Sequence, residues 1–266
     1  MLLSSVVVPC DVLSGVSEDT DAFHEVKSGH FIVKFTLPEE KAFSSKVLDR
    51  AEECYDRISR DIGYSRYQNY WTWEQRVKIV LFPDRYAFTR FTGQPKWSKG
   101  YASRDSRLFR DRVIVSFSGQ SDFFEEILPH EISHLMLWDY LGFNNRKVPV
   151  WFEEGVAQLQ EADKREVVKE ALRPVVADKS YIPFREFNEF TVTGLDDDAK
   201  VVVFYAQSLS VVIFLAEKYG QDAFYRLIKE LRNGGGFEPA LFRSYTGIYD
   251  SMAALEDKWA QYILCQ

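Results

Sequence analysis

The stretch 128-LPHEISHLMLWDYLG-142 contains two of the four histidines of the chain, four residues apart, with a glutamate directly after the first. On a helix, His130 and His134 lie on one face one turn apart, so both imidazoles can bind one metal ion. Glu131 is one residue further round, so its carboxylate points beside the ion. The neighbouring residues are apolar, which predicts that the three polar side chains are buried. This spacing is the HExxH arrangement, in which two histidines on one helix face bind zinc.

A zinc site that has only these two histidines lacks one protein ligand, since catalytic zinc usually binds three. A second helical stretch, 149-PVWFEEGVAQLQE-161, follows after a stop at Gly142 and a short loop. Two consecutive helices joined by a tight loop can bring an acidic side chain of the second back over the histidines of the first. Glu154 is the candidate for this third ligand, and Glu153 is its nearest rival.

Composition sets limits on the class of protein. With 266 residues, 46% of them hydrophobic and 15% aromatic, the chain can bury one sizeable core or two small ones. A formal charge of -7 repels phosphate backbones, so we expect no nucleic-acid partner. The three cysteines lie far apart and form no CxxC pair, which indicates neither a disulfide framework nor a thiolate zinc site.

The N-terminal segment 1–22 is predicted to be flexible. Its first residues, MLLSSVVVPC, are apolar but too short to span a bilayer, and they lack the basic region of a complete secretory signal. They are either the remnant of a signal peptide, which favours an exported protein, or an ordinary frayed terminus. Elsewhere we expect no stable membrane span. The sequence does not predict the oligomeric state.

The order of secondary structure is alternating at first and helical later, which predicts an α+β protein. Short β-branched and aromatic runs predict strands at 30–35, 77–82, 97–103 and 112–117, with turn-rich, arginine-containing residues 104–111 between the last two. Apolar spacing predicts helices at 39–63, 84–91, 122–141, 149–172, 198–218, 221–232 and 250–263, with breaks at glycines and at Pro174.

The motif HEISH followed by WFEEGVA resembles the gluzincin pattern HExxH then WxxEGxA, and it is most similar to the peptidase MA-like group of bacterial zinc metallopeptidases. From about residue 29 to 263 the order of elements also resembles that group. The resemblance implies a zincin-like (gluzincin) fold, in which a small mixed β-sheet with helices precedes a mainly helical part and the active-site cleft lies between them. It implies one peptidase domain over 23–266, with subdomains 23–142 and 143–266.

The same resemblance implies an activity, the zinc-dependent hydrolysis of peptide bonds in peptides or proteins. It implies that His130, His134 and Glu154 bind Zn2+ and that Glu131 is the general base. Only the residue directly before Gly155 matches the glutamate of the WxxEGxA pattern, which favours Glu154 over Glu153.

Other classes of zinc site fit the residues less well. A metzincin needs a third histidine shortly after the motif, but positions 137 and 140 are Leu137 and Tyr140. A site with an aspartate ligand would have to use Asp139, which is on the same helix only five residues past His134 and is badly placed.

Two further predictions concern the substrate. Peptides in this fold usually lie along an exposed sheet edge, and the candidate edge is 97–103, with Lys99, Gly100, Tyr101 and Ala102 as substrate-binding residues. Gly100 either allows the substrate backbone to approach closely or marks a bulge.

The oxyanion of the reaction needs a second electrophile besides the metal. No histidine follows His134, so this role cannot fall to a downstream histidine. In aminopeptidase-type gluzincins a tyrosine from a comparable downstream helix serves, and Tyr205 is the matching candidate. The alternative is that Tyr205 is a half-buried core residue.

Two alternative functions remain open at this stage. The chain could be a self-inhibited or autoprocessing gluzincin, with residues 1–15 or another segment in its cleft. It could also be a non-catalytic binding module that has kept a zinc fold, although no residue of the motif is missing. The substrate, and the choice between endo- and exopeptidase action, are not encoded in any pattern that we recognise.

Overall fold

The computed structural model describes residues 23–64, 71–104, 112–142, 147–190 and 198–265. The predicted flexible segment 1–22 and the turn-rich 105–111 lie outside the described residues. The chain divides into two compact units, 1–136 and 137–266, called the first and the second unit below. The division falls within one continuous helix, α3 (Leu128–Leu141), which carries the HExxH motif. The predicted domain and subdomain boundaries stay predictions.

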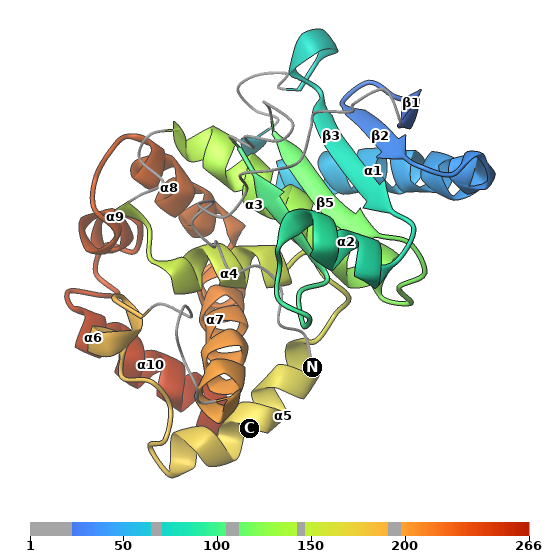
Figure 1. Cartoon of the computed structure of the whole chain (residues 1–266). Helices are drawn as coiled ribbons and strands as arrows, with labels where there is room; N and C mark the ends of the chain where they lie inside the picture. The colour runs from blue at the N-terminus through green and yellow to red at the C-terminus, as the bar shows by residue number, and fades with distance from the viewer. Residues whose placement is uncertain (1–22, 65–70, 105–111, 143–146, 191–197, 266) are drawn as a thin grey trace. The chain divides into compact units, whose positions relative to one another are not determined.

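The first unit contains a five-stranded mixed sheet with the order β1-β2-β3-β5-β4 (Figure 1). The strands β2, β3 and β5 are mutually parallel, whereas β1 and β4 pair antiparallel with β2 and β5 at the two edges. Their bounds are β1 His24–Lys27, β2 Phe31–Phe35, β3 Val77–Phe82, β4 Gly100–Ser103 and β5 Val113–Phe117. The predicted small N-terminal mixed sheet is therefore confirmed.

The apolar residues of the central strands explain their position. All five residues of β5 are buried, as expected for a parallel strand that is covered on both faces. The helix α1 (Lys41–Asp61) connects β2 to β3. After β3 comes α2 (Arg85–Thr92), where Asp84 Oδ1 accepts a hydrogen bond from the Ala87 amide at 2.8 Å and so caps the helix. Phe88 of α2 packs against Val80, Phe82, Val113, Val115 and Phe117.

The strand β1 was not predicted. Its sequence, HEVK, is mostly exposed, so it shows no alternation of buried and exposed residues. Its position follows from antiparallel pairing with β2, in which His24 lies opposite Phe35 and Lys27 opposite Ile32. A strand that is held mainly by backbone hydrogen bonds at a sheet edge leaves little trace in the hydrophobic pattern.

The predicted helix 122–141 is present, but its first turn differs from a regular α-helix. Residues Phe123–Ile127 form a π-helix, and α3 continues from Leu128. The carbonyl oxygen of Asp122 accepts hydrogen bonds from the amides of Glu126, at 2.9 Å, and Ile127, at 3.3 Å. Such wide turns often occur near functional sites, and this one directly precedes the helix that carries His130 and His134.

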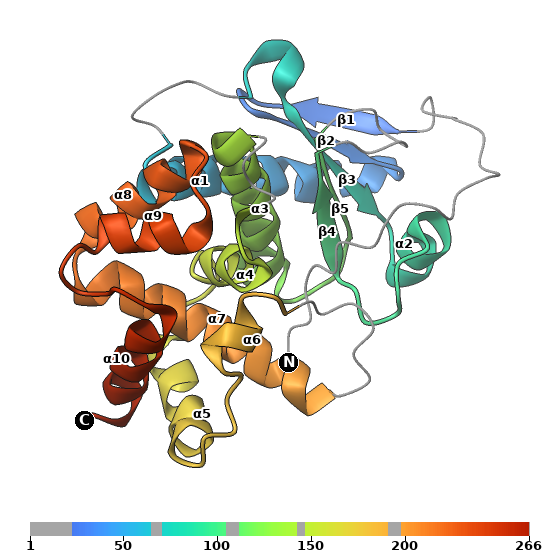
Figure 2. The same ribbon diagram turned by 90° about the vertical axis from the view of Figure 1, so that its left-hand side faces the viewer.

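The described part of the second unit is helical, which confirms the predicted helical C-terminal part. After the C-terminal end of α3 it contains α4 Val150–Gln158, α5 Arg165–Ala177, α6 Phe184–Phe187, α7 Asp198–Lys218, α8 Gln221–Arg232, α9 Phe237–Ser244 and α10 Met252–Leu264. The long helix α7 is central, and α4, α5, α8 and α10 pack against it (Figure 2). Neither α6 nor α9 was predicted, because each is short and close to a proline.

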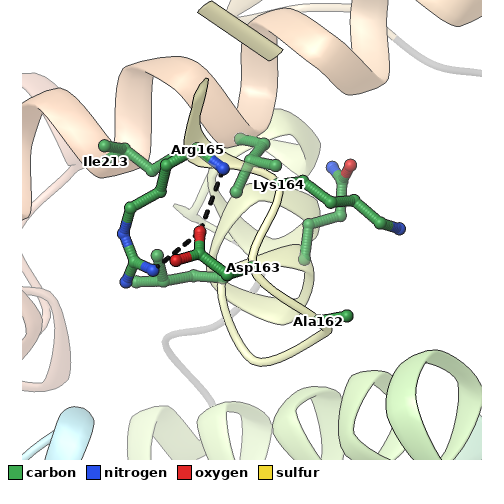
Figure 3. Close-up of a pocket in the computed structure, with 8 residues that line it drawn as sticks. Ala162, Asp163, Lys164, Arg165 and Ile213 are labelled. Carbon is green, nitrogen blue, oxygen red and sulfur yellow. Dashed lines mark hydrogen bonds and ion pairs between the residues drawn. The ribbon is translucent and has the colours of Figure 1, made fainter. Parts of the chain in front are cut away.

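The prediction of one helix over 149–172 is wrong, because the chain turns between α4 and α5 (Figure 3). Asp163 Oδ1 accepts a hydrogen bond from the Arg165 amide at 3.1 Å and pairs with the Arg165 guanidinium at 2.9 Å. Glu161 is buried and pairs with Lys164 at 2.6 Å. These local polar contacts favour a turn over a continued helix. The helix α5 then continues past Pro174 to Ala177.

One described helix is long and apolar enough to cross a membrane. It is Ala199–Lys218 in α7, with a mean hydropathy of 1.9 over its most apolar window. Of that window, 72% is buried inside the protein. The central core helix of a globular unit has the same length and hydropathy, so the absence of a membrane span stays a prediction.

Candidate metal centre

The two motif histidines converge on one point. Both side chains project from adjacent turns of α3, and they are 0% and 2% exposed. The Nε2 atom of His134 lies 3.1 Å from the Nε2 atom of His130. The ring centroids are 4.7 Å apart with an interplanar angle of 75°. The prediction that this spacing places both imidazoles together on one helix face is confirmed.

This separation fits two ligands of one zinc ion. Zinc binds imidazole nitrogen at about 2.0–2.1 Å, and tetrahedral geometry then places two such nitrogens about 3.3–3.4 Å apart. The observed 3.1 Å between the Nε2 atoms is close to this value. Imidazole nitrogen is also among the donor types that zinc prefers. The donor pair on α3 therefore suits zinc in both chemistry and spacing.

The environment of His134 favours the form that can bind a metal. Burial lowers the pKa of the His134 imidazole well below 6.5, and the neighbouring His130 lowers this pKa further. The imidazole is therefore neutral near pH 7. Only a neutral imidazole has a lone pair free for a metal.

Glu131 is completely buried, and the next polar residue of the helix, Ser133, is 1% exposed. Burying a carboxylate costs free energy of hydration, and this cost is accepted where partner groups offset it or where the carboxylate has a function. Glu131 follows His130 directly, so helix geometry turns it about 100° away from the histidine face. This position suits a group that acts beside a metal rather than on it.

The helix α4 carries the second sequence motif, WFEEGVA. Within the second unit, the Trp138 indole Nε1, from the last turns of α3, donates a hydrogen bond to Glu153 Oε2 at 2.9 Å. This contact places the start of α4 beside the C-terminal half of the motif helix. Glu153 is therefore the hydrogen-bond partner of Trp138. The next residue, Glu154, is buried, with 3% of its surface exposed.

The remaining residues of WFEEGVA fix α4 in the second unit. Trp151 is fully buried, stacks on Phe187 with a centroid distance of 5.1 Å and donates from Nε1 to Asn188 Oδ1 at 2.9 Å. A Cβ atom on Gly155 would lie 2.9 Å from the carbonyl carbon of Ser208 and 2.5 Å from a methyl carbon of Val212. Glycine at this position therefore allows α4 and α7 to approach closely.

His130, His134 and Glu154 are three buried side chains that each offer one ligand atom, and together they form a group that could hold a metal ion. Two imidazoles and one carboxylate are the ligand set of a gluzincin-type catalytic site. The donor set agrees with the expectation from the sequence.

Tyr205 is buried on α7 at 6% exposure. It lies one turn before Ser208, the residue that faces Gly155. The amide Nε2 of Gln158 donates to the carbonyl oxygen of Tyr205 at 3.1 Å and lies 3.4 Å from the carbonyl oxygen of Glu154. The Tyr205 backbone is therefore tied to α4 near Glu154, and the role of its hydroxyl stays a prediction.

The predicted substrate strand, β4, is at the edge of the sheet. Its Gly100 is buried, and a Cβ atom there would lie 3.1 Å from a methyl carbon of Ile127 and 3.2 Å from the Val115 carbonyl oxygen. The glycine is thus explained by packing inside the first unit. Tyr101 packs against the core cluster near Phe88. The substrate contacts of these residues and of Ala102 stay predictions.

The sequence analysis missed three residues around Lys99. Its ammonium group pairs with Asp122, and its carbonyl oxygen accepts hydrogen bonds from Ser116 Oγ at 2.7 Å and from Gln120 Nε2 at 3.1 Å. All three partners belong to β5 or to the segment that leads to α3. Side chains that bond to a residue about twenty positions away leave no local pattern in the sequence.

Comparison with known families agrees with the site. The sequence profile of the peptidase MA superfamily matches residues 93–265, which include the edge strand, the motif helix and every helix of the second unit. No curated protein matches the chain. The matched region covers well over half of the sequence and contains His130, His134 and Glu154. The chain belongs to the peptidase MA superfamily.

Proposed function

We propose that this protein is a zinc-dependent peptidase of the gluzincin type. The observation that carries the proposal is the convergence of the His130 and His134 Nε2 atoms, 3.1 Å apart, on a buried helix face beside Glu131. Membership of the peptidase MA superfamily supports it independently.

In this proposal His130, His134 and Glu154 hold the metal. Zinc would lower the pKa of a water molecule at the site and polarise the carbonyl of the scissile bond. Glu131 acts as the general base. Its carboxylate takes one proton from the attacking water, whose oxygen adds to the carbonyl carbon. Glu131 then returns this proton to the leaving amine nitrogen as the C–N bond breaks, and the products are an amine and a carboxylic acid, which releases the second proton of the water to the solvent at neutral pH.

The chain supplies two further functions in this proposal. The strand β4, which lies at the edge of the sheet, binds the substrate backbone by antiparallel hydrogen bonds. The Tyr205 hydroxyl donates a hydrogen bond to the oxyanion that develops in the transition state.

The proposal is tested by comparing the wild-type protein with Glu131→Gln. We expect about one zinc per chain in both proteins by elemental analysis. We expect hydrolysis of a quenched-fluorescence peptide library by the wild type alone, and its loss after treatment with a chelator. A neutral amide cannot accept the proton of water, so the variant should keep the fold and lose nearly all turnover.

A matched pair of neighbouring acids tests the third ligand. Glu154→Gln should lower zinc content, whereas Glu153→Gln, which alters the partner of Trp138, should keep both zinc and activity. A wild-type protein that holds zinc and cleaves no library peptide would instead be a non-catalytic member. Equal activity of the wild type and Glu131→Gln would show that the base is elsewhere.

A further inference from the structure

Lys99 lies directly before the edge strand β4, yet all of its polar side-chain and carbonyl contacts in the described structure point into the first unit. Its ammonium group pairs with Asp122. Its carbonyl oxygen accepts from both Ser116 Oγ and Gln120 Nε2. A carbonyl oxygen has two lone pairs, and two donors use both. Lys99 therefore has no free acceptor for a substrate, although it is next to the strand that is proposed to bind one.

The hydrogen bonds around Lys99 have a defined direction. Gln120 Nε2 lies 3.1 Å from the carbonyl oxygen of Lys99, 3.1 Å from that of Phe117 and 2.9 Å from Ser116 Oγ. Two of these neighbours can only accept, so the amide nitrogen and not the amide oxygen faces them. The Ser116 hydroxyl accepts from Gln120 and donates to Lys99. The side chains of Gln120 and Ser116 and the carbonyl oxygen of Lys99 form one connected network that joins β5 to the start of β4.

The other end of this network reaches the motif helix. Asp122, which pairs with Lys99, also provides the carbonyl oxygen that accepts from Glu126 and Ile127 in the π-helix before α3. Ile127 in turn fills the space beside Gly100, where a Cβ atom would lie only 3.1 Å from its methyl carbon. The first residue of β4 and the first turn of the helix that carries His130 and Glu131 are therefore in direct contact.

We propose that Lys99 is a positioning residue. Through its ion pair with Asp122 and the hydrogen bond from Gln120 to its carbonyl oxygen, it fixes the edge strand β4 at a set distance from the Glu131 end of the motif helix. The inference rests on the proposed function and deepens it. It replaces a substrate-binding role for Lys99 with a role that acts through β4. A peptide bound along β4 then meets the general base in a fixed register.

If Lys99 positions β4, removing its contacts should weaken the binding of ligands that lie along β4 and of no others. A displacement of about 1 Å between a bound substrate and the catalytic groups can cost on the order of 100-fold in rate. A ligand that binds only the metal does not use β4 and should not respond. A general loss of structure would weaken both kinds of ligand, so the difference between them isolates positioning.

The experiment uses Gln120→Met, which keeps the size of the side chain and removes its donors, and Lys99→Met. Two probes are titrated against each holoenzyme, acetohydroxamate and a peptide hydroxamate several residues long. We expect the affinity for the peptide hydroxamate to fall about 10- to 100-fold in both variants. Affinity for acetohydroxamate and zinc content should equal those of the wild type.

Ser118→Ala is the matched control. Ser118 lies in the same connection between β5 and α3 and donates to Glu40 Oε1 at 2.8 Å, so it loses a hydrogen bond of similar length without affecting Lys99. It should bind both probes as the wild type does. Hydrogen exchange of the amides at 100–103, measured by mass spectrometry, should be faster in Gln120→Met and Lys99→Met and unchanged in Ser118→Ala.

Unchanged affinity for the peptide hydroxamate in Gln120→Met would overturn the inference. If the wild type binds neither hydroxamate, the proposed function fails, and hydrogen exchange then decides the anchoring of β4 by itself. Equal exchange in the wild type and Gln120→Met would show that Lys99 does not fix the strand. If Lys99→Met fails to fold, Gln120→Met carries the test.

Discussion

Gly155 of α4 packs directly against the backbone of Ser208 in α7. The site for a Cβ atom on Gly155 lies 2.9 Å from the carbonyl carbon of Ser208 and closer still to its carbonyl oxygen. Because Glu154 precedes Gly155 and Tyr205 is one turn before Ser208, this contact also sets the distance between the two helices that carry these candidate site residues.

Gly155→Ala is expected to destabilise the protein. Alanine favours a helix over glycine by about 1 kcal/mol, but the added methyl would have to displace backbone, and overpacking costs about 1–3 kcal/mol or more. The midpoint of urea unfolding should therefore fall. Gly29→Ala is the control, since its Cβ would lie 3.6 Å from Glu52, an ordinary contact. An unchanged midpoint in Gly155→Ala would show that the helices can separate at little cost.

His134→Ala is expected to abolish stoichiometric zinc binding. The variant removes one of the two imidazoles whose Nε2 atoms lie 3.1 Å apart, and a site with two protein ligands holds zinc far more weakly than one with three. Elemental analysis after gel filtration measures the zinc per chain. His24→Ala, which changes an exposed histidine of β1, should keep its zinc. Full zinc occupancy in His134→Ala would place the metal elsewhere.

Tyr205→Phe is expected to lower kcat by about 100- to 1000-fold, the usual cost of one oxyanion donor, while KM, zinc content and Tm stay near those of the wild type. Tyr245→Phe is the matched control. Its hydroxyl donates to the Leu215 carbonyl oxygen at 2.9 Å in the core of the second unit, so this variant should lose stability and keep kcat. If Tyr205→Phe retains the wild-type kcat, Tyr205 is a core residue.

Glu52 is expected to contribute to stability in a pH-dependent way. Burial raises the pKa of its carboxyl, but hydrogen bonds from the His30 ring, Ser28 and the His30 amide outweigh burial and lower this pKa from 4.5 to about 2. The distances from Glu52 to the His30 ring and amide are 2.6 and 2.9 Å. Because the pKa is lowered in the folded state, the contribution is complete above about pH 4.5 and is lost as the pH falls toward 2.

The variant Glu52→Gln removes this titration. Its free energy of unfolding should be lower than that of the wild type at pH 7, and the difference should shrink as the pH falls from 4.5 toward 2. Unfolding by urea at several pH values measures both proteins. Glu53→Gln, on the same helix and paired at 3.0 Å with Arg50 at the surface, is the control. A difference that does not depend on pH would assign the effect of Glu52 to packing.

The sequence by itself determined the features that depend on local geometry. A spacing of four residues on a helix is enough to place His130 and His134 together, and the structure confirms it. Long apolar runs were enough for the central strands and for α1, α3, α7, α8 and α10, because the period of the pattern follows from the backbone geometry of each element.

Where elements end was harder to predict. The helix predicted over 149–172 turns between α4 and α5, because the Asp163 side chain accepts a hydrogen bond from the Arg165 amide, and such side-chain bonds to the backbone compete with a continued helix. Nothing in the apolar spacing of 149–172 shows this competition. The edge strand β1 was missed for a related reason. It is stabilised by backbone pairing with β2, and its own side chains contribute little.

Only the tertiary structure decided which residues meet across long separations in the chain. The glycine of the second motif is required by the backbone of Ser208, about fifty residues away, and Lys99 contacts Gln120 and Asp122, which follow the next two strands. Such contacts depend on the paths of two elements through space. A sequence pattern records the period within one element, and it carries no information on which groups of another element lie opposite.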